Sequence, residues 1–493
     1  MSDIVNWLNG YVWSPVLVYF LLGIGLMYSI LTRFLQVRLF KEMIKLAFEG
    51  GDSNAGVKSF QALMMSLGSR IGVGNVAGVA TAISLGGPGA VFWMWLAAFF
   101  GSALSFIEIT LTQVYKRKID GEYRGGTPFY IEKGVKLRWF AILSSIITLV
   151  VMGILWPGVQ ANTVALMMDS AFGISPTTTG VFMVVLLGVI IFGGVKRIAK
   201  AAEIMVPFMA LSYIVVCLII LVMNYSSIPS VMSLIFTSAF NLNATFGGLI
   251  GSALAWGVQR GIYATGAGLG SETFESGAAE VSHPAKQGLV QALSVYIDAF
   301  LICTSTAFMI LMTGMYDVKP EGMEPITNKL GDVAPSLYTQ LAIESVFPGF
   351  GAAFLAIALF FFCFTTLMSY YYKAETNFAF LRDTLRIKSM WPNHVLKVVL
   401  LATVMYGCVK TAAVVWAMGD LGAGLMAWVN LVVVALLTRT ALKVLKDYEV
   451  QKKAGKNPVF DPVKLGIKEA DFWEKEYGKV EQDIPAEQDK LPV

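Results

Sequence analysis

The chain has 493 residues, of which 56% are hydrophobic and 14% are charged, and its formal net charge is +4. Because a soluble domain carries roughly 25% charged residues, this composition excludes a soluble globular protein and predicts an all-α integral membrane protein. The small net charge gives no reason to expect a nucleic-acid partner, and the lipid bilayer is the expected surrounding.

Eleven stretches are apolar over the roughly 20 residues that a helix needs to cross a bilayer. In chain order they fall near 12–35, 59–85, 88–115, 138–169, 176–195, 201–224, 244–282, 286–315, 346–374, 395–418 and 420–445. The sequence therefore predicts eleven transmembrane helices.

Lysine and arginine concentrate on one side of this predicted bundle, which the positive-inside rule makes the cytoplasmic side. With eleven helices, the basic clusters at 33–45, 116–118 and 196–200 share that side, and the other side carries only Lys319, Lys329 and Lys410. We expect a multi-pass protein of the cell inner or plasma membrane, with the N-terminus outside and the C-terminus in the cytoplasm.

The second predicted helix holds Gly72, Gly74 and Gly78 around Asn75, near its middle. In hydrocarbon, unwound backbone survives only where it lines a polar cavity, and glycine lets a ligand approach the main chain closely. Small residues also permit close helix packing, so this helix alone leaves both interpretations open.

The seventh predicted helix is interrupted in the same way, over residues 263–284. Numbered from the second helix, the two breaks lie in helices 1 and 6 of ten, which cross the membrane in opposite directions. Paired discontinuous helices in two inverted repeats are typical of secondary transporters, whose binding site lies at the midplane. Half-helix N-termini suit a carboxylate and freed carbonyls suit a cation, so a zwitterion is the expected ligand.

The chain accordingly divides into four parts. We expect an extra N-terminal transmembrane helix with a cytoplasmic amphipathic linker (1–58), a first five-helix repeat (59–225), a second five-helix repeat (226–446) and a solvated, polar cytoplasmic tail (447–493).

Two further helices carry polar side chains inside apolar runs. In helix 3, Gln160 and Asn162 either face the cavity or bond to neighbouring helices. In helix 8, Thr365, Thr366 and Ser369 offer hydroxyl oxygens at one depth, and hard cations such as Na⁺ favour oxygen ligands. Such hydroxyls also bond to carbonyls of their own helix. Because helix 8 abuts the helix 1 break in a five-plus-five transporter, we interpret Thr365 and Thr366 as sodium ligands.

Charged side chains inside a membrane are rare and need partners. Arg70 and Glu108 lie on the cytoplasmic side of the first break, and Arg260 and Asp298 share a similar depth near the second. We predict two structural or gating ion pairs, Arg70–Glu108 and Arg260–Asp298.

Three carboxylates follow the second break: Glu272, Glu275 and Glu280. We expect them to face a cytoplasmic vestibule, where one of them would permit proton coupling.

At these residues the sequence resembles the alanine or glycine:cation symporter family, the sodium:alanine symporters. The segment that resembles the family signature is GGPGAVFWMWLAAFFG, and RGGTPFYIEKG, GVQANTVA and HPAKQGLVQ also resemble family segments. The resemblance implies a LeuT-type 5+5 inverted repeat with discontinuous helices 1 and 6 and one extra N-terminal helix. It also implies uptake of small amino acids driven by Na⁺ or, in some members, by H⁺.

By motif, the resemblance places the substrate carboxylate and amine against the main chain of Gly72, Val73 and Gly74 and the side chain of Asn75. Gln160 matches a substrate-contacting glutamine of the family.

The resemblance adds residues from two more helices. Tyr263 falls where the family usually has phenylalanine, and Thr366 and Tyr370 fall on substrate-facing positions of helix 8. Thr365 and Thr366 match the Ser/Thr pair of the family's sodium site, to which we also assign the main chain of Gly72.

This chain departs from the family pattern in the substrate half of the site. The usual Gly-Thr-Gly-Asn has Val73 at its second position, and the usual Ser-Asn-Glu-Ala-Gly is replaced by residues 264–268, ATGAG. These changes alter the size and polarity of the predicted pocket.

We interpret the chain as a sodium-coupled symporter that imports a small neutral amino acid, alanine or glycine, by alternating access. It is not expected to be an enzyme, because its two histidines have no metal-type spacing. The alternatives are a proton-coupled transporter of the same fold, a carrier of glutamine or another neutral amino acid, and a transporter-like amino-acid sensor that signals through its tail. No oligomeric state is predicted.

Overall fold

A computed structural model describes residues 2–49, 56–240, 249–387, 389 and 391–477. This part of the chain is mostly helical, which confirms the predicted all-α class. One short antiparallel hairpin joins β1 (Arg117–Ile119) to β2 (Glu122–Arg124), with Arg117 opposite Arg124.

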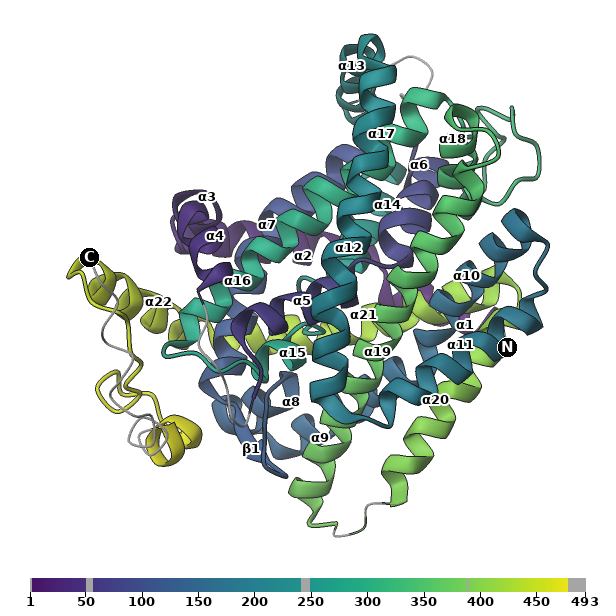
Figure 1. Ribbon diagram of the computed structural model, residues 1–493. Helices are drawn as coiled ribbons and strands as arrows, with labels where there is room; N and C mark the ends of the chain where they lie inside the picture. Colours follow the sequence, from purple (N-terminus) through teal and green to yellow (C-terminus); the bar gives the residue numbers. More distant parts are fainter. Residues whose placement is uncertain (1, 50–55, 241–248, 388, 390, 478–493) are drawn as a thin grey trace, which may run out of the picture.

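The helices follow one another from the N-terminus to the C-terminal segment (Figure 1). They are α1 (Ser2–Val12), α2 (Pro15–Leu31), α3 (Leu35–Arg38), α4 (Phe40–Phe48), α5 (Ser59–Arg70), α6 (Val79–Gly86), α7 (Ala90–Val114), α8 (Thr127–Tyr130), α9 (Arg138–Val150), α10 (Pro157–Phe172), α11 (Pro176–Ile191), α12 (Gly194–Met223), α13 (Ile228–Ala239), α14 (Ile250–Thr265), α15 (Thr273–Gly277), α16 (Pro284–Tyr296), α17 (Thr304–Thr313), α18 (Tyr338–Val346), α19 (Gly351–Leu385), α20 (Trp391–Val409), α21 (Ala412–Leu436) and α22 (Thr438–Lys453).

Within the described residues, seven helices are long and apolar enough to cross a membrane, or eight if the bent pair α1–α2 forms one span. The other expected spans coincide with the shorter helix α11 and with the two helices that contain breaks. A multi-pass membrane protein is therefore supported, while the count of eleven and the repeat boundaries remain predictions. The expected span 244–282 begins outside the described residues.

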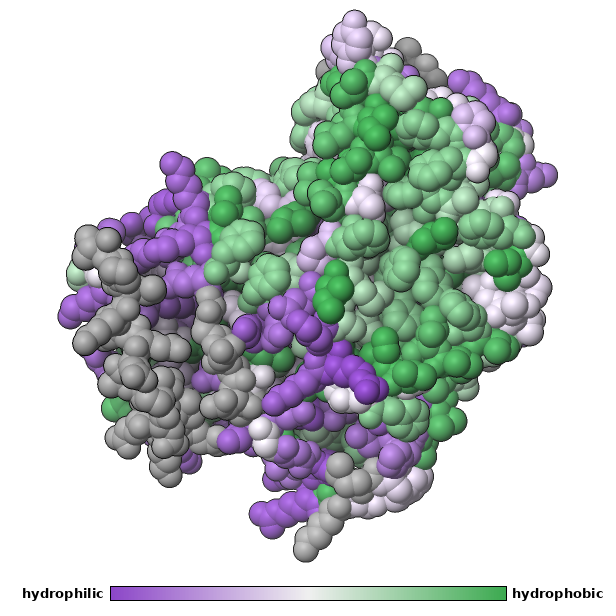
Figure 2. Space-filling model, viewed as in Figure 1, coloured by the Kyte–Doolittle hydropathy of each residue, from purple (hydrophilic) through white to green (hydrophobic). Residues whose placement is uncertain are grey.

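The surface divides into an apolar part and a polar part. Figure 2 shows hydrophobic residues over the side where Figure 1 places α12 and α19, and hydrophilic residues toward α22, α4 and β1. On α12, Ile204, Phe208 and Val222 are 63%, 72% and 71% exposed. Apolar patches of this kind suit contact with lipid rather than water.

The segment after α22 differs from the expected solvated tail as far as residue 477, and the rest of the tail lies outside the described residues. Phe472 and Trp473 are buried, and the Trp473 indole donates to the carbonyl of Gln113 at 2.9 Å. The aromatic residues give this otherwise polar segment enough apolar surface to bury against the bundle.

The two interrupted helices meet in the interior. The first is α5 and α6, separated by an irregular stretch and a π-helical turn at Gly74–Gly78, and the second is α14 and α15. Figure 1 shows α5 and α15 side by side near the centre of the molecule, and α7 packs along both α14 and α16. The fold therefore places both breaks beside each other in the interior.

Candidate functional site

The first break is held open by side chains rather than by helical hydrogen bonds. Helix α5 ends at Arg70, and Ile71 is extended, with φ −70° and ψ 90°. The amide of Gly72 donates to Asn75 Oδ1 at 3.1 Å, and the amide of Val73 donates to Gln160 Oε1 at 3.1 Å. Main-chain donors that a helix would have satisfied are thus met by two amide side chains.

Gly72 lies where a larger residue would force the side chain of Thr366 or Gln160 to move. A Cβ at this position would be 2.8 Å from Thr366 Oγ1 and 2.9 Å from Gln160 Oε1. The Gln160 amide also donates to the Tyr370 hydroxyl at 3.0 Å. The structure therefore brings together Gly72, Gln160, Thr366 and Tyr370, from helices 1, 3 and 8 of the predicted repeats.

Asn75 connects the first break to a buried carboxylate. Its Nδ2 donates to Asp298 Oδ1 at 2.6 Å, while its Oδ1 accepts from Gly72. Asp298 lies in a π-helical turn at Ile297–Cys303, between α16 and α17, and is fully buried. π-Helical turns often occur at functional sites because they redirect side chains and free main-chain groups.

The second break is longer and depends on glycine conformations. Gly266, Gly268 and Gly270 have φ of +64°, +88° and +70°, a region that other residues rarely adopt. The amide of Gly268 donates to Glu108 Oε1 at 3.2 Å. Asn430 Nδ2 donates both to Glu108 Oε2, at 2.6 Å, and to the carbonyl of Gly268, at 2.9 Å.

Each break is hydrogen-bonded, directly or through one side chain, to a carboxylate from the other predicted repeat. Glu108, on the second helix of the first predicted repeat, holds the break of the second repeat. Asp298, on the second helix of the second predicted repeat, holds the break of the first through Asn75. This reciprocal arrangement is what two inverted repeats around a shared site would produce.

A small cavity lies between the breaks. It is lined by Ser69, Arg70, Gly74, Trp156, Gln160, Tyr263, Ala264, Gly266, Ser271, Glu272 and Tyr370. Its volume is about 10 Å³, which is the room that one water molecule needs. An amino acid therefore enters only if the surrounding elements move apart, as alternating access requires.

Aromatic rings close the cavity on one side. The ring of Trp156 lies 5.6 Å from that of Tyr263 and 5.3 Å from that of Tyr370, and its indole donates to the carbonyl of Gly419. Sequence reasoning did not assign Trp156 to the site. Its position directly before Pro157, inside an apolar run, was the available signal.

The candidate sodium site contains four oxygens. The hydroxyls of Thr365 and Thr366 each lie 3.0 Å from the carbonyl oxygen of Gly68 and 2.9 Å from that of Phe362. Oxygen ligands from hydroxyls and carbonyls suit a hard cation. The Gly68 carbonyl, three residues before the break, was missed because its helix reads as continuous there.

The predicted ion pair between Arg260 and Asp298 is wrong. Arg260 makes a bidentate contact with Asp420, at 2.7 and 2.8 Å, and stacks over the ring of Trp416. Depth along the bundle matched Asp298, but the side chains face different neighbours, and Asp420 on α21 was not considered.

The predicted pair between Arg70 and Glu108 also differs from the structure. The ion pair of Arg70 is with Glu272, whose Oε2 lies 3.8 Å from Arg70 Nε. The carboxylate of Glu108 instead accepts from Gly268 and Asn430. Glu272 and Glu275 are 2% and 0% exposed, so these two do not face an open vestibule in this conformation.

Asn162 bonds to a neighbouring helix and does not line the cavity. Its Nδ2 donates to the carbonyls of Gly407 and Lys410, which ties α10 to the end of α20. Ser369 donates to the carbonyl of Met65 and so ties α19 to α5.

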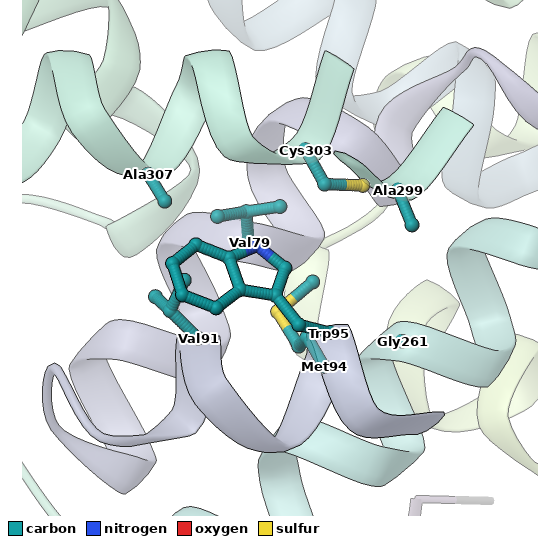
Figure 3. Close-up of a pocket in the computed structure, with 8 residues that line it drawn as sticks. All are labelled: Val79, Val91, Met94, Trp95, Gly261, Ala299, Cys303 and Ala307. Carbon is teal, nitrogen blue, oxygen red and sulfur yellow. The ribbon is translucent and has the colours of Figure 1, made fainter. Parts of the chain in front are cut away.

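A second small cavity lies beside the site and is apolar. Figure 3 shows its lining by Val79, Val91, Met94, Trp95, Gly261, Ala299, Cys303 and Ala307. The Trp95 indole is already bonded to Thr304 Oγ1 at 2.8 Å. A zwitterion would find no charged partner in this lining, so the cavity between the breaks is the better candidate.

Comparisons with known proteins give a family match and several named relatives. Residues 1–462 match the profile of the sodium:alanine symporter family. The chain is 58% identical to a protein of Bacillus subtilis (strain 168) named "Putative sodium/proton-dependent alanine carrier protein YrbD", over 97% of this chain and 98% of the relative. It is 52% identical to the "Sodium/proton-dependent alanine carrier protein" of Bacillus sp. (strain PS3), over 89% and 99% of the two chains.

A solved structure shares the fold at low sequence identity. The crystal structure of a mutant manganese transporter from Eremococcus coleocola matches with a TM-score of 0.51 and 13% identity. The match covers 83% of this chain and 89% of that chain. This likeness supports a helical transporter fold and nothing about the cargo.

Proposed function

Because the chain belongs to the sodium:alanine symporter family, whose members are transporters and not enzymes, we propose that it imports a small neutral amino acid, alanine or glycine, together with a cation. We further propose the 5+5 inverted repeat with an extra N-terminal helix, the N-terminus outside and the C-terminus in the cytoplasm. The names of two relatives, one of them given as putative, describe alanine carriers and support the cargo.

The observation that carries this proposal is the pair of breaks that face one cavity. The main chain at Gly72–Gly74 and the side chains of Asn75 and Gln160 supply neutral dipoles for a zwitterion. Tyr263, Trp156 and Tyr370 limit the room for a side chain, which favours alanine or glycine over glutamine.

We assign the principal coupling ion as Na⁺, held by Thr365, Thr366 and main-chain oxygens near Gly68 and Gly72. Four oxygens in contact support the assignment: the hydroxyls of Thr365 and Thr366 and the carbonyls of Gly68 and Phe362. Gly72 lies beside Thr366. A cation there would bridge helices 1 and 8 and so stabilise the conformation that binds substrate, which is how two cargoes become coupled.

The test is uptake by the purified protein in proteoliposomes. Labelled alanine, glycine, serine and glutamine are offered with an inward Na⁺ gradient, with equal Na⁺ on both sides, and without Na⁺. We expect concentrative uptake of alanine and glycine only with the gradient. Uptake of glutamine alone, or accumulation that ignores both Na⁺ and H⁺ gradients, would contradict the proposal.

A further inference from the structure

Six ionisable side chains lie together in the interior, around the second break. Each is at most 3% exposed. We refer to this set as the ion cluster: Arg70, Glu108, Glu272, Glu275, Asp298 and Lys373. It contains two cationic groups and four carboxyls, so full ionisation would leave two uncompensated negative charges in a low-dielectric interior. Such a charge excess is costly and favours uptake of a cation.

Lys373 is the centre of the cluster on the side of the second break. Its Nζ donates to Ser69 Oγ at 2.6 Å and to Glu272 Oε1 at 3.0 Å, and it lies 3.3 Å from Glu275 Oε1. One ammonium group on helix 8 therefore bridges the residue next to the first break and two carboxyls after the second.

The four carboxyls differ in how well their charged forms are supported. Glu108 accepts two hydrogen bonds and Glu272 accepts from Lys373 and Ser271. Asp298 accepts one, from Asn75. For Glu275, within the described chain, neither oxygen accepts a hydrogen bond of good geometry, and its contact with a cation is the Lys373 pair shared with Glu272. Protonating Glu275 removes the least supported buried charge.

A further buried cation, Lys116, lies just after α7, and its Nζ donates to the carbonyl of Ala279 at 2.8 Å, two residues beyond the end of α15. Helix α5 contributes Arg70, whose guanidinium is bonded to Ser105 and Ser294 and lies near Glu272. Helix α7 contributes Glu108, and α19 contributes Lys373 and the phenol of Tyr370. On β2, Arg124 is held by Glu122 and Glu375.

Glu272 connects the cluster to the substrate. It lines the cavity between the breaks, and its Oε2 has no hydrogen-bond partner among the described residues. Lys373 is attracted to both Glu275 and Glu272, so a change in the charge of Glu275 changes how strongly Lys373 binds Glu272. It thereby changes the link that Lys373 forms between Glu272 and Ser69.

We propose that Glu275, together with Lys373 and Glu272, is the proton-binding site of the transport cycle. The Glu275 carboxylate takes a proton from water that enters the open chamber, and the cluster closes around Lys373. When the chamber opens to the cytoplasm, the carboxyl returns the proton to water there. This inference rests on the proposed amino-acid transport and assigns the site of its proton partner.

The experiment uses the full chain in proteoliposomes that contain a trapped pH-sensitive dye, with equal Na⁺ on both sides and with the membrane potential clamped. For the wild type, we expect external alanine to acidify the lumen. For Glu275→Gln, we expect the rate of alanine-dependent acidification to fall at least about tenfold, which lies within the range of factors by which coupled sites typically affect each other. Glu275→Asp, which keeps a carboxyl, is expected to restore part of the acidification.

Alanine counterflow, measured without any ion gradient, reports folding and substrate exchange separately. Glu275→Gln is expected to keep measurable counterflow. Glu280→Gln removes a carboxyl of the same segment outside the cluster and serves as the matched control for acidification.

Two results overturn the proton site: wild-type protein that is active in counterflow but does not acidify the lumen when external alanine is added, and Glu275→Gln protein that acidifies the lumen like the wild type. Failure of wild-type counterflow would instead overturn the proposed function.

Discussion

The two breaks face the same cavity but are held by different chemistry. The first break is short (residues 71–73), and its main-chain amides donate to the neutral side-chain amides of Asn75 and Gln160. The second break is longer (residues 266–272) and contains three glycines of positive φ. Its partners are the charged groups Glu108 and Lys373.

This difference separates two tasks within one site. Fixed neutral dipoles suit a zwitterion and a sodium ion, which must bind and leave without large changes in charge. A shared ammonium among carboxyls suits a group that changes its protonation state. In the proposed inverted repeats the two breaks take matching positions, and we infer that the different residues at those positions divide the functions.

The largest expected effect is at the first break. Asn75→Ala leaves Asp298 and the Gly72 amide buried without their partner. Two lost buried hydrogen bonds, one of them to a carboxylate, predict an uptake of alanine at least about 100-fold slower. Asn162→Ala, which removes a buried amide outside the cavity, is the matched control, measured as initial uptake rate in proteoliposomes. Near-normal uptake by Asn75→Ala would remove the first break from the site.

At the second break, we expect an intermediate effect from Glu108→Gln. The new amide can still accept from Gly268, but its NH₂ group faces the Nδ2 donor of Asn430. One mismatched buried hydrogen bond predicts roughly a tenfold lower uptake rate. A larger loss than that of Asn75→Ala would show that the second break, and not the first, dominates substrate binding.

A smaller effect, specific to the ion, is expected at the sodium site. Thr366→Ala removes one of four oxygens and is predicted to raise the Na⁺ concentration for half-maximal uptake about fivefold, the cost of one weakened contact of about 1 kcal/mol. Thr163→Ala is the control, because that hydroxyl bonds only to the carbonyl of Val159 within the described contacts. An unchanged Na⁺ dependence would count against the ligand role of Thr366.

The smallest effect is expected for Tyr263→Phe. The Tyr263 hydroxyl has no hydrogen-bond partner among the described residues, and the ring packs against Trp156 and Trp416. Removing the hydroxyl is predicted to change alanine uptake less than about twofold, because no buried partner is orphaned. A loss of tenfold or more would indicate that this hydroxyl bonds to the substrate directly.

The sequence predicted the parts of this account that depend on local composition. Glycine runs in two apolar stretches indicated both breaks, and the interrupted helices end at Arg70 and Thr265. The polar residues Gln160 and Thr366 stood out against hydrocarbon-like neighbours, and the structure places both beside Gly72.

The partners of the buried charges were not predictable in the same way. Pairing by depth chose Asp298 for Arg260, whereas the rotation of α21 presents Asp420. Lys373 was passed over because it follows three tyrosines near the end of an apolar run, where a lysine usually reaches the membrane surface. In the structure it is fully buried, and that fact needed the packing of α5 and α15 around it.

The most direct test of the central claim is a cryo-electron microscopy map of the protein in lipid nanodiscs with alanine and Na⁺. The account predicts density for alanine between Gly72–Gly74 and Tyr263–Gly266, with Gln160 beside it and a cation at Thr365 and Thr366. Alanine bound elsewhere, or helices wound without interruption through residues 71–73 and 266–272, would contradict it.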